Sequence, residues 1–445
     1  MTRSLRALIL GTAAVMAAGV VSPLRAQDTT YRGIFLNGSY DPLHDKVAIV
    51  VLPIVGAFGD SIRTIVQRDL DYSDRFTVLP VDTTDPSAFR MPGAAAGLNY
   101  PLFTHLNAAA VVEITQIGGG VHVALHDVVH GQVVNVAERV LSGNPLSREW
   151  RLGVHQTSDE IERWIYGQRG IAATRIAYLR GNAIRIIDSD GADEITVPTD
   201  EYGFSPAWSP DGASLVYNTY APVPSRLVLL DLATGRSRTL ITAPKNTQYV
   251  TPVFTPDGNS ILFARSGENG SDIYSVSATG TDATMRRLTV GRGAVNEQPV
   301  MSPNGRRIVY TGNALGRPEL YIMDADGTGA DVLTNYDFSE KNYRSDPDWS
   351  SDGRLIAYQE RVNDRFQIRV IPVTGGTPKL LTSEGENESP SWAPDARHLV
   401  FTSTRTGVRQ LWVLDTESSR MRQLTTSAGS RLAAWSPRLN AAALQ

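Results

Sequence analysis

The sequence predicts a two-domain protein, with a small N-terminal α/β domain followed by an all-β propeller of six blades. Three observations predict this fold. A motif of the Trp-Ser-Pro-Asp-Gly type returns six times after residue 168, its copies are evenly spaced, and the residues before it do not repeat but alternate strand-like and helix-like patterns. The chain has 445 residues, 42% of them apolar and 20% charged, which is enough apolar material for a large core.

The first 26 residues have the pattern of a secretory signal. Arg3 and Arg6 precede the apolar run 7–21, and a cleavage site is expected between Ala26 and Gln27. The apolar run is shorter than the roughly 20 residues that a membrane-spanning helix needs. We therefore expect a signal peptide over 1–26 that is removed on export, and a soluble mature chain.

The composition excludes several chemistries. The chain contains no cysteine, so disulfides, thiolate zinc sites, a cysteine nucleophile and a lipidated cysteine anchor are excluded. The net charge of -4 gives no general electrostatic reason to bind nucleic acid or an anionic membrane. An exported chain without disulfides has to be stabilised by its core, which favours a large regular fold.

The N-terminal domain is expected over 27–168. Asp60 is predicted to cap the first long helix, and Thr157 with Glu160 to form a capping box on the last one. The segment 27–42 is expected to be an edge strand or a partner-binding arm. The other expected elements are a buried strand over 46–54, strands at "RFTVL" and "AAVVEITQI", a short helix near "YPLFTHL" and a hairpin over 121–141.

The repeated motif predicts propeller blades. Its aromatic or methionine position falls at 208, 254, 301, 349, 392 and 435, with spacings of 46, 47, 48, 43 and 43. A period in the forties that contains several short strands is typical of a blade. Within the motif, Pro fixes φ at the first inner turn position, Asp bonds its own backbone and Gly tolerates a positive φ. The aromatic residue is expected to pack against the neighbouring blade.

The ends of the repeat region predict how the ring is completed. The segment from Thr174 starts at the second strand of a blade, and "AAWSP" at 433 stops after a first strand. Together they supply one full blade, so we expect six blades over 169–440, closed by pairing of the first and last strands, and a tail over 441–445. Closure removes the open sheet edges that favour aggregation.

Two kinds of pattern in the sequence could suggest a metal site. His122, His126 and His130 have a four-residue spacing, but their context favours a strand, on which they lie too far apart to share one ion. The segments "DSDGADE" at 188 and "DADGTGAD" at 324 resemble calcium loops but lack the complete twelve-residue pattern. We expect no metal site and no cofactor. A loosely held cation in the propeller channel remains an alternative.

The sequence contains neither a Gly-x-Ser-x-Gly elbow nor a P-loop. Glu297, Asp346 and Glu388 lie in predicted loops, where carboxylates are mostly solvated and only sometimes act as glycosidase acids. The sequence therefore predicts no catalytic residue.

The order of the parts resembles the TolB family, the soluble periplasmic component of the Tol–Pal envelope system. The resemblance rests on the export signal, the small α/β domain, the joint "HQTSDEIERWIYGQRGIAATRIAY" over 155–178, the "WSPDG" repeats and the terminal "WSPRL". It covers essentially the whole mature chain. The joint and the domain order are the specific part, because peptidase-type propellers share the repeats.

The resemblance implies a periplasmic adaptor without enzymatic activity. Such proteins bind the peptidoglycan-associated lipoprotein Pal through the propeller and the inner-membrane protein TolA through the N-terminal arm. They support outer-membrane integrity and constriction during cell division. We accordingly expect a monomer that associates with the outer membrane only through Pal and binds no nucleic acid.

Two surfaces are predicted to bind these partners. The Pal-binding face is expected where loops from six blades converge at the channel rim, just before each inner strand. Its residues are Phe204, Ser205, Val250, Thr251, Glu297, Gln298, Ser345, Asp346, Glu388, Ser389, Ser430 and Arg431. The TolA-binding arm is represented by Gln27, Tyr31, Ile34, Leu36 and Tyr40.

Two other functions compete with the adaptor. The first is an exported hydrolase or lyase with its active site at the channel mouth. It would need converging acids, histidines or metal ligands, and no histidine is among the rim residues. The second is an accessory propeller of a peptidase that has lost its catalytic domain, which the N-terminal domain and the joint disfavour.

Overall fold

The computed structural model describes residues 46–92, 97–199, 202–220, 224–280, 284–291, 293–334 and 343–440. The predicted signal, its cleavage site, the arm over 27–42 and the tail over 441–445 lie outside these residues. Within the described ranges, no helix combines the length and the apolar character needed to cross a membrane.

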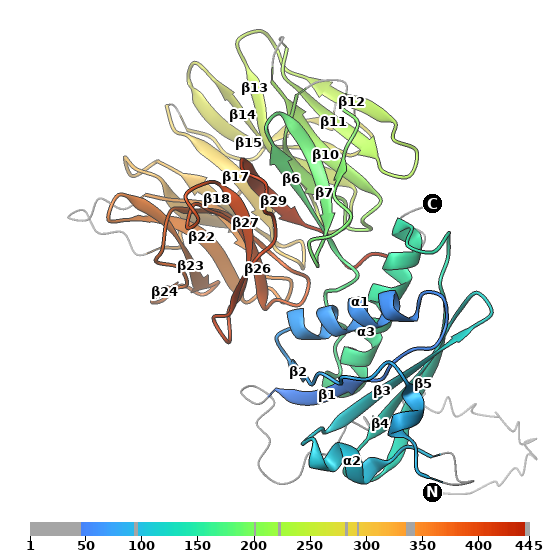
Figure 1. Ribbon diagram of the computed structural model, residues 1–445. Coiled ribbons are helices and arrows are strands. Elements are labelled where there is room, and N and C mark those ends of the chain that lie inside the picture. The colour runs from blue at the N-terminus through green and yellow to red at the C-terminus, as the bar shows by residue number, and fades with distance from the viewer. Residues whose placement is uncertain are drawn as a thin grey trace, which may run out of the picture. The chain divides into compact units, whose positions relative to one another are not determined.

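The N-terminal α/β domain contains one five-stranded sheet with the strand order β2-β1-β3-β4-β5 (Figure 1). Strands β1, β2 and β3 are mutually parallel, and β3, β4 and β5 are antiparallel. The strands are β1 Val47–Val51, β2 Phe76–Val78, β3 Ala110–Ile117, β4 Gly120–Asp127 and β5 Gln132–Val140. The helices are α1 Gly59–Tyr72, η1 Pro86–Phe89, α2 Tyr100–His105 and α3 Arg148–Tyr166.

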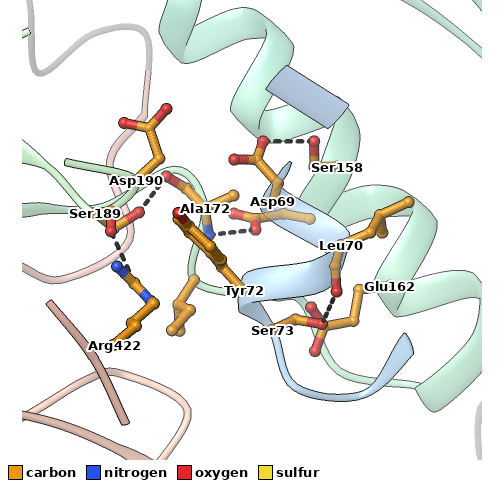
Figure 2. A pocket seen from close by; sticks show the side chains of 12 residues that line it. Asp69, Leu70, Tyr72, Ser73, Ser158, Glu162, Ala172, Ser189, Asp190 and Arg422 are labelled. Atoms are coloured by element: carbon orange, nitrogen blue, oxygen red, sulfur yellow. Dashed lines mark hydrogen bonds between the residues drawn. The ribbon is translucent and has the colours of Figure 1, made fainter. Parts of the chain in front are cut away.

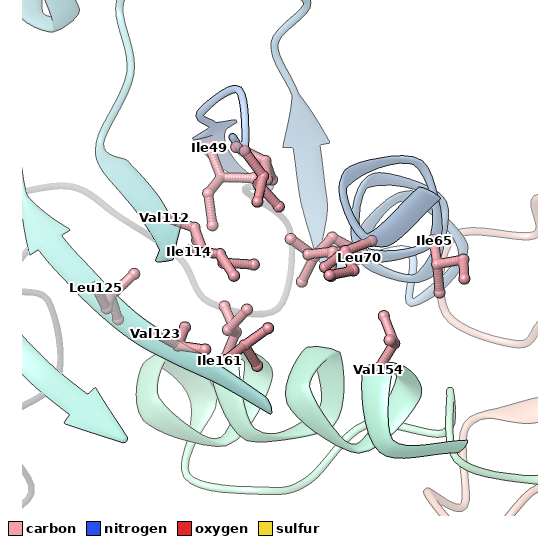
Figure 3. Packing of buried hydrophobic residues seen from close by; sticks show 14 of the residues in the cluster. Ile49, Ile65, Leu70, Val112, Ile114, Val123, Leu125, Val154 and Ile161 are labelled. Atoms are coloured by element: carbon pink, nitrogen blue, oxygen red, sulfur yellow. The ribbon is translucent and has the colours of Figure 1, made fainter. Parts of the chain in front are cut away.

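The sheet is covered on both faces because its central strands are apolar throughout. In β1, Ile49 and Val51 pack with residues of α1 and α3, whereas Val50 packs on the other face with Phe89 of η1 and Phe103 of α2. Figure 3 shows the first of these clusters, in which α1 and α3 face the sheet. Alternation of side chains along a strand explains how one apolar run supplies two cores.

Both predicted helix caps were wrong. Helix α1 begins at Gly59, so Asp60 lies in its first turn, where a carboxylate interacts favourably with the helix dipole, and Phe58 at the N-cap makes no side-chain cap bond. Helix α3 begins nine residues before the predicted Thr157, at Arg148, and Ser147 caps it by accepting a hydrogen bond from the Trp150 backbone N–H at 3.3 Å. Thr157 is inside the helix and donates to the Gly153 carbonyl at 3.0 Å, which satisfies its hydroxyl without a cap.

The propeller consists of six four-stranded antiparallel sheets, as the repeat predicts (Figure 1). The first strand of each sheet is called its inner strand below. The first three sheets are β9 Gly203–Trp208, β10 Ser214–Thr219, β11 Arg226–Asp231 and β12 Ser237–Thr242; β13 Gln248–Phe254, β14 Ser260–Gly267, β15 Gly270–Ser277 and β16 Arg286–Arg287; and β17 Asn296–Met301, β18 Arg307–Gly312, β19 Glu319–Asp324 and β20 Asp331–Val332. The last three are β21 Arg344–Trp349, β22 Leu355–Val362, β23 Arg365–Pro372 and β24 Lys379–Leu380; β25 Asn387–Trp392, β26 His398–Ser403, β27 Gln410–Asp415 and β28 Met421–Gln423; and β29 Ser430–Trp435, β6 Arg175–Arg180, β7 Ala183–Asp188 and β8 Ile195–Thr196. In the sixth sheet the inner strand β29 pairs with β6, which lies more than 240 residues earlier in the chain.

The repeated motif has the structural role that the sequence predicts. In the first copy, the Ser209 hydroxyl donates to Asp211 at 2.5 Å and accepts from the Ser214 backbone N–H at 2.9 Å, while Gly212 has a φ of 74°. The aromatic position packs between adjacent sheets, because Trp349 of β21 belongs to one buried cluster with Leu320 of β19. The motif therefore builds the turn and the contact between blades.

Candidate functional site

The two sides of the propeller differ in the loops that they carry. Every inner strand begins on one side, the start face, together with the hairpins that join the second and third strands of each sheet. Every inner strand ends on the other side, the turn face, where the Ser-Pro-Asp-Gly turns and the turns between the third and fourth strands lie. The predicted Pal-binding residues come from the beginnings of the inner strands, and therefore from the start-face half of the channel.

Each inner strand is interrupted by a β-bulge at the same position. The bulged residue has a left-handed backbone in all six strands, with φ between 47° and 55°, although none of the six is glycine. Bulges of this kind redirect side chains and often occur beside functional sites. These residues, called the bulge ring below, are Ser205, Thr251, Gln298, Asp346, Ser389 and Leu432.

The bulge ring contains the second member of five of the six predicted pairs. The sixth pair, Ser430 and Arg431, lies one residue too early, since the equivalent residues are Arg431 and Leu432. A proline follows the bulge in the other five strands, and Ala433 replaces it in β29. The sequence pattern therefore had no proline with which to align the last copy.

Hydrogen bonds connect four members of the bulge ring across neighbouring blades. The Gln298 backbone N–H donates to the Thr251 hydroxyl at 3.2 Å, and the Asp346 backbone N–H donates to the Gln298 side-chain oxygen at 3.0 Å. The Gln298 amide also donates to the Asp346 carboxylate, which accepts from the Ser389 hydroxyl at 2.9 Å. The structure thus brings Thr251, Gln298, Asp346 and Ser389 together.

The remaining predicted residues divide by exposure. Val250, Ser345 and Ser430 are buried, so their side chains are not available to a partner. Phe204 is half-buried and packs edge-to-face against Tyr220, with ring centroids 4.8 Å apart. Glu297, Glu388 and Arg431 are also half-buried, and Glu388 pairs with Arg409 at 3.2 Å.

Negative charge accumulates at this part of the channel. Burial, together with the nearby charges of Glu388 and Glu297, raises the pKa of Asp346 to about 6 against the opposing hydrogen bond from Ser389. Three carboxylates, Glu297, Asp346 and Glu388, therefore lie near one another, and Arg409 pairs with Glu388. Such an uneven charge distribution favours a partner with basic groups.

Exposed apolar side chains surround these charges on the start face. They belong to the loops that precede inner strands and to the hairpins between second and third strands, which the sequence prediction did not include. The residues are Tyr202, Val290, Val295, Leu315, Tyr343 and Val408. The ring of Tyr343 packs edge-to-face on Phe366, at 5.5 Å between centroids. The sequence did contain a signal for these residues, because turns normally carry Gly, Asn or Asp and here they carry apolar residues.

The turn face meets α1 and α3 of the N-terminal domain through buried ion pairs. Arg151 of α3 binds Asp188 at 3.1 Å and Asp190 at 2.9 Å, and Arg68 of α1 also binds Asp190, at 3.0 Å. Figure 2 shows other side chains at this contact: Asp69 and Ser158 come from α1 and α3, and Ser189 and Asp190 come from the propeller loop that follows β7. We call the cross-domain charged residues here and at the fifth sheet the polar junction. Its residues are Arg68, Asp69, Asp71, Asp74, Arg151, His155, Asp188, Asp190, His398 and Arg420.

A second part of the polar junction lies at the fifth sheet. Arg420 reaches Asp71 at 2.8 Å and Asp74 at 3.0 Å, and His398 lies 3.4 Å from Asp74. The clusters Asp69–His155–Asp190 and Asp74–His398–Asp415 are compact enough to hold a metal ion. In both clusters, arginine and histidine side chains already pair with the carboxylates. We therefore interpret both clusters as ion-pair networks.

The three histidines singled out in the sequence do not converge. His122 lies 3.9 Å from Glu138, His126 lies 3.3 Å from Glu113, and His130 lies 2.7 Å from Asp127. Each histidine thus has its own carboxylate partner on the sheet of the N-terminal domain. The histidines with cross-domain partners, His155 and His398, carried no motif in the sequence.

Comparison with known proteins agrees with this architecture. The family model described as the TolB beta propeller domain matches residues 163–439. The Tol–Pal system protein TolB of Gluconobacter oxydans is 32% identical over 414 residues, which are 87% of this chain and 86% of the relative. TolB of Actinobacillus succinogenes is 32% identical over 203 residues, 43% of this chain and 47% of the relative. The crystal structure of TolB from Acinetobacter baumannii has a TM-score of 0.74 at 25% identity, covering 88% of this chain and 97% of that one.

By its fold, the protein belongs to the class of six-bladed propellers that carry an N-terminal α/β domain. Within that class, the length of the alignment and the likeness to a solved structure decide the family. The chain belongs to the TolB family of the Tol–Pal system.

Proposed function

We propose that this protein is a periplasmic, non-catalytic adaptor that binds Pal through the start face of the propeller and TolA through the segment 27–42. The observation that carries the Pal assignment is the set of exposed apolar residues around the acidic residues at the channel mouth. Exposed apolar groups rimmed by polar ones are typical of protein–protein interfaces. In such an adaptor, partner exchange would link Pal to outer-membrane constriction during division.

Different residues of the start face are expected to contribute to the affinity for Pal and to the selection of Pal as the partner. Tyr343 is a large aromatic side chain on a packed support, Phe366, which is the kind of residue that anchors an interface. Glu297 and Arg431 lie nearer the channel and contribute charge complementarity. Truncating the aromatic residue should therefore increase the dissociation rate, whereas reversing a charge should mainly change the association rate and its salt dependence.

The test is a calorimetric titration of residues 27–445 with the soluble domain of Pal from the same cell. We expect saturable one-to-one binding that weakens by about tenfold or more in Tyr343→Ser and in Glu297→Lys. Glu138→Lys, an exposed acid on β5 of the N-terminal domain, is the matched control and should bind as the wild type does. Absence of binding at high micromolar concentrations would contradict the Pal assignment.

The TolA assignment is tested on the same protein. Deleting residues 27–40 removes Gln27, Tyr31, Ile34, Leu36 and Tyr40, and should abolish TolA binding while leaving the thermal unfolding transition in place. The deletion should also change the affinity for Pal if the arm and the propeller are coupled. Unchanged TolA binding by the shortened protein would contradict the proposed role of the arm.

The alternative is an exported hydrolase or lyase with its active site at the channel mouth. It requires a nucleophile, a general base or a metal set that converges there. Among the described residues of the bulge ring and its predicted neighbours, the ionisable groups are Glu297, Asp346, Glu388 and Arg431. Failure of the Pal titration, together with turnover of a substrate that is lost in Asp346→Asn, would favour the enzyme over the adaptor.

A further inference from the structure

The channel contains a pocket in its turn-face half. The pocket has a volume of about 340 Å³ and is lined by residues from all six inner strands. It extends from the bulge ring to the Trp-Ser-Pro turns, and the residues that precede the bulge ring on those strands do not line it. The pocket therefore adjoins the start face proposed for Pal and shares five bulge-ring residues with the predicted Pal-binding set, Ser205, Thr251, Gln298, Asp346 and Ser389. Its size lies at the lower end of the range of small-ligand sites.

The pocket wall is mostly apolar. In five of the six strands the residue after the bulge is a proline, and Ala433 takes its place in the sixth. Proline lacks a backbone N–H, so this level of the wall offers few hydrogen-bond donors. The prolines are Pro206, Pro252, Pro299, Pro347 and Pro390. Transfer of the apolar body of a ligand from water to such a wall is favourable.

Among the described residues that line the pocket, two carboxylates are the only charged side chains. Asp346 and Asp348 flank Pro347 on β21, and neither forms an ion pair with any described residue. Asp348 accepts a hydrogen bond from the Trp392 backbone N–H at 2.6 Å, and Asp346 accepts from Gln298 and Ser389. Each side chain is half-buried and keeps part of its surface open to the channel. Burial raises the pKa of both carboxyls to about 6.

We propose that this half of the channel is a binding site for a small organic ammonium ion with an apolar body. The ammonium group would pair with Asp348 and Asp346, and the body would lie against the prolines. A ligand of this class supplies the positive charge that the chain itself does not supply to these carboxylates. A neutral ligand would leave two half-buried charges without a partner, and an anion would be repelled by them.

The first experiment uses hexylammonium chloride as the probe, titrated by calorimetry into residues 27–445 at about pH 8. At that pH the carboxyls are ionised and an alkylamine is still protonated. We expect saturable one-to-one binding, about tenfold or more weaker binding of 1-hexanol, and no binding of hexanoate. Equal affinity for hexylammonium and 1-hexanol, or no binding of hexylammonium at millimolar concentrations, would overturn the proposal.

Two variants locate the site. Asp348→Asn keeps an acceptor for the Trp392 N–H and removes the charge, so it should weaken hexylammonium by about tenfold or more. Ala433→Leu fills the pocket from another strand without touching a carboxylate, and should abolish binding of the probe. Glu138→Gln, on the N-terminal domain, is the matched control and should leave affinity unchanged. Wild-type affinity in a folded Ala433→Leu variant would place the probe elsewhere and overturn the assignment.

The pH dependence gives an independent readout. The charges of Glu297 and Glu388 lie near Asp346, and Asp348 is the only other charged residue among the described residues that line the pocket. Protonation of the two carboxyls removes the charge that the ammonium ion requires, so affinity should fall as the pH is lowered through about 6. Constant affinity between about pH 5 and 8 would contradict the ion pair.

Discussion

His155 of α3 lies between two carboxylates of different domains: its Nδ1 is 2.9 Å from Asp69 of α1 and its Nε2 is 3.7 Å from Asp188 at the end of β7. All three side chains are buried. Burial alone would lower the pKa of His155, but the charges of Asp69 and Asp188 outweigh it and raise the pKa to about 10. The imidazolium therefore bridges the N-terminal domain and the propeller as a fixed positive charge.

Removing this charge should destabilise the protein. His155→Gln leaves the buried Asp69 without its cationic partner, whereas Asp188 keeps Arg151 and Arg175, and we expect a loss of about 3 kcal/mol in the free energy of unfolding. Urea denaturation followed by circular dichroism measures it. His105→Gln, at an exposed histidine on α2, is the control and should change stability by less than about 0.5 kcal/mol. Equal stability of both variants would show that the bridge is not stabilising.

The same bridge predicts an alkaline pH dependence. The pKa of His155 is higher in the folded protein, about 10, than the value of about 6.5 in an unfolded chain. Its contribution is therefore complete below about pH 6.5 and is lost as the pH rises to about 10. We expect the difference in unfolding free energy between wild type and His155→Gln to shrink over that range. A difference that is constant with pH would contradict a charged His155, and groups that titrate in both proteins cancel in this comparison.

The propeller could be predicted because its determinants are local. Within each turn, residues such as Ser209, Asp211 and Gly212 lie next to one another in the chain, and the pattern recurs in every blade. The bulge ring could be aligned wherever a proline follows it, and only the copy with Ala433 was placed one residue off. The cap of α3 was missed because both Ser147 and Thr157 are residue types that cap helices, and Asp60 was predicted to be a cap although α1 begins without one.

The polar junction could not be predicted from sequence. Asp69 and His155 are 86 positions apart, and Asp74 and His398 are 324 positions apart, with no periodic pattern that relates them. Their pairing depends on how the N-terminal helices dock on the turn face, which is a tertiary property. The apolar residues of the start face were missed for a related reason, since single apolar residues in loops become a surface only when the blades bring them together.

The bulge ring should contribute measurable stability through Gln298. Its side-chain oxygen accepts hydrogen bonds from the Asp346 backbone N–H at 3.0 Å and from the Thr311 hydroxyl at 2.7 Å. Gln298→Ala leaves both donors without this acceptor, so we expect a cost of about 1–3 kcal/mol in urea denaturation. Gln423→Ala, at an exposed glutamine that donates to Thr425, should cost less than about 0.5 kcal/mol. If both variants unfold at the same urea concentration, the ring bonds are replaced by water.

The cost of a left-handed backbone can be tested by two opposite substitutions, one in the Ser-Pro-Asp-Gly-type turn of the fifth sheet and one in the equivalent turn of the fourth sheet. Ala396 has a φ of 57° at the position that glycine occupies in the preceding sheets, for example Gly353 with a φ of 75°. A left-handed backbone costs a non-glycine residue about 1–2 kcal/mol. Replacing that residue by glycine removes this cost, but the greater conformational freedom of glycine in the unfolded chain offsets part of the stabilisation. We expect Ala396→Gly to stabilise the protein by about 0.5–1 kcal/mol and Gly353→Ala to destabilise it by about 1 kcal/mol. A Cβ atom at Gly353 would meet no atom closer than 3.9 Å, so the second effect reports the backbone alone. Urea midpoints that move in the same direction for both substitutions would show that the turn conformation is not what limits stability at this position.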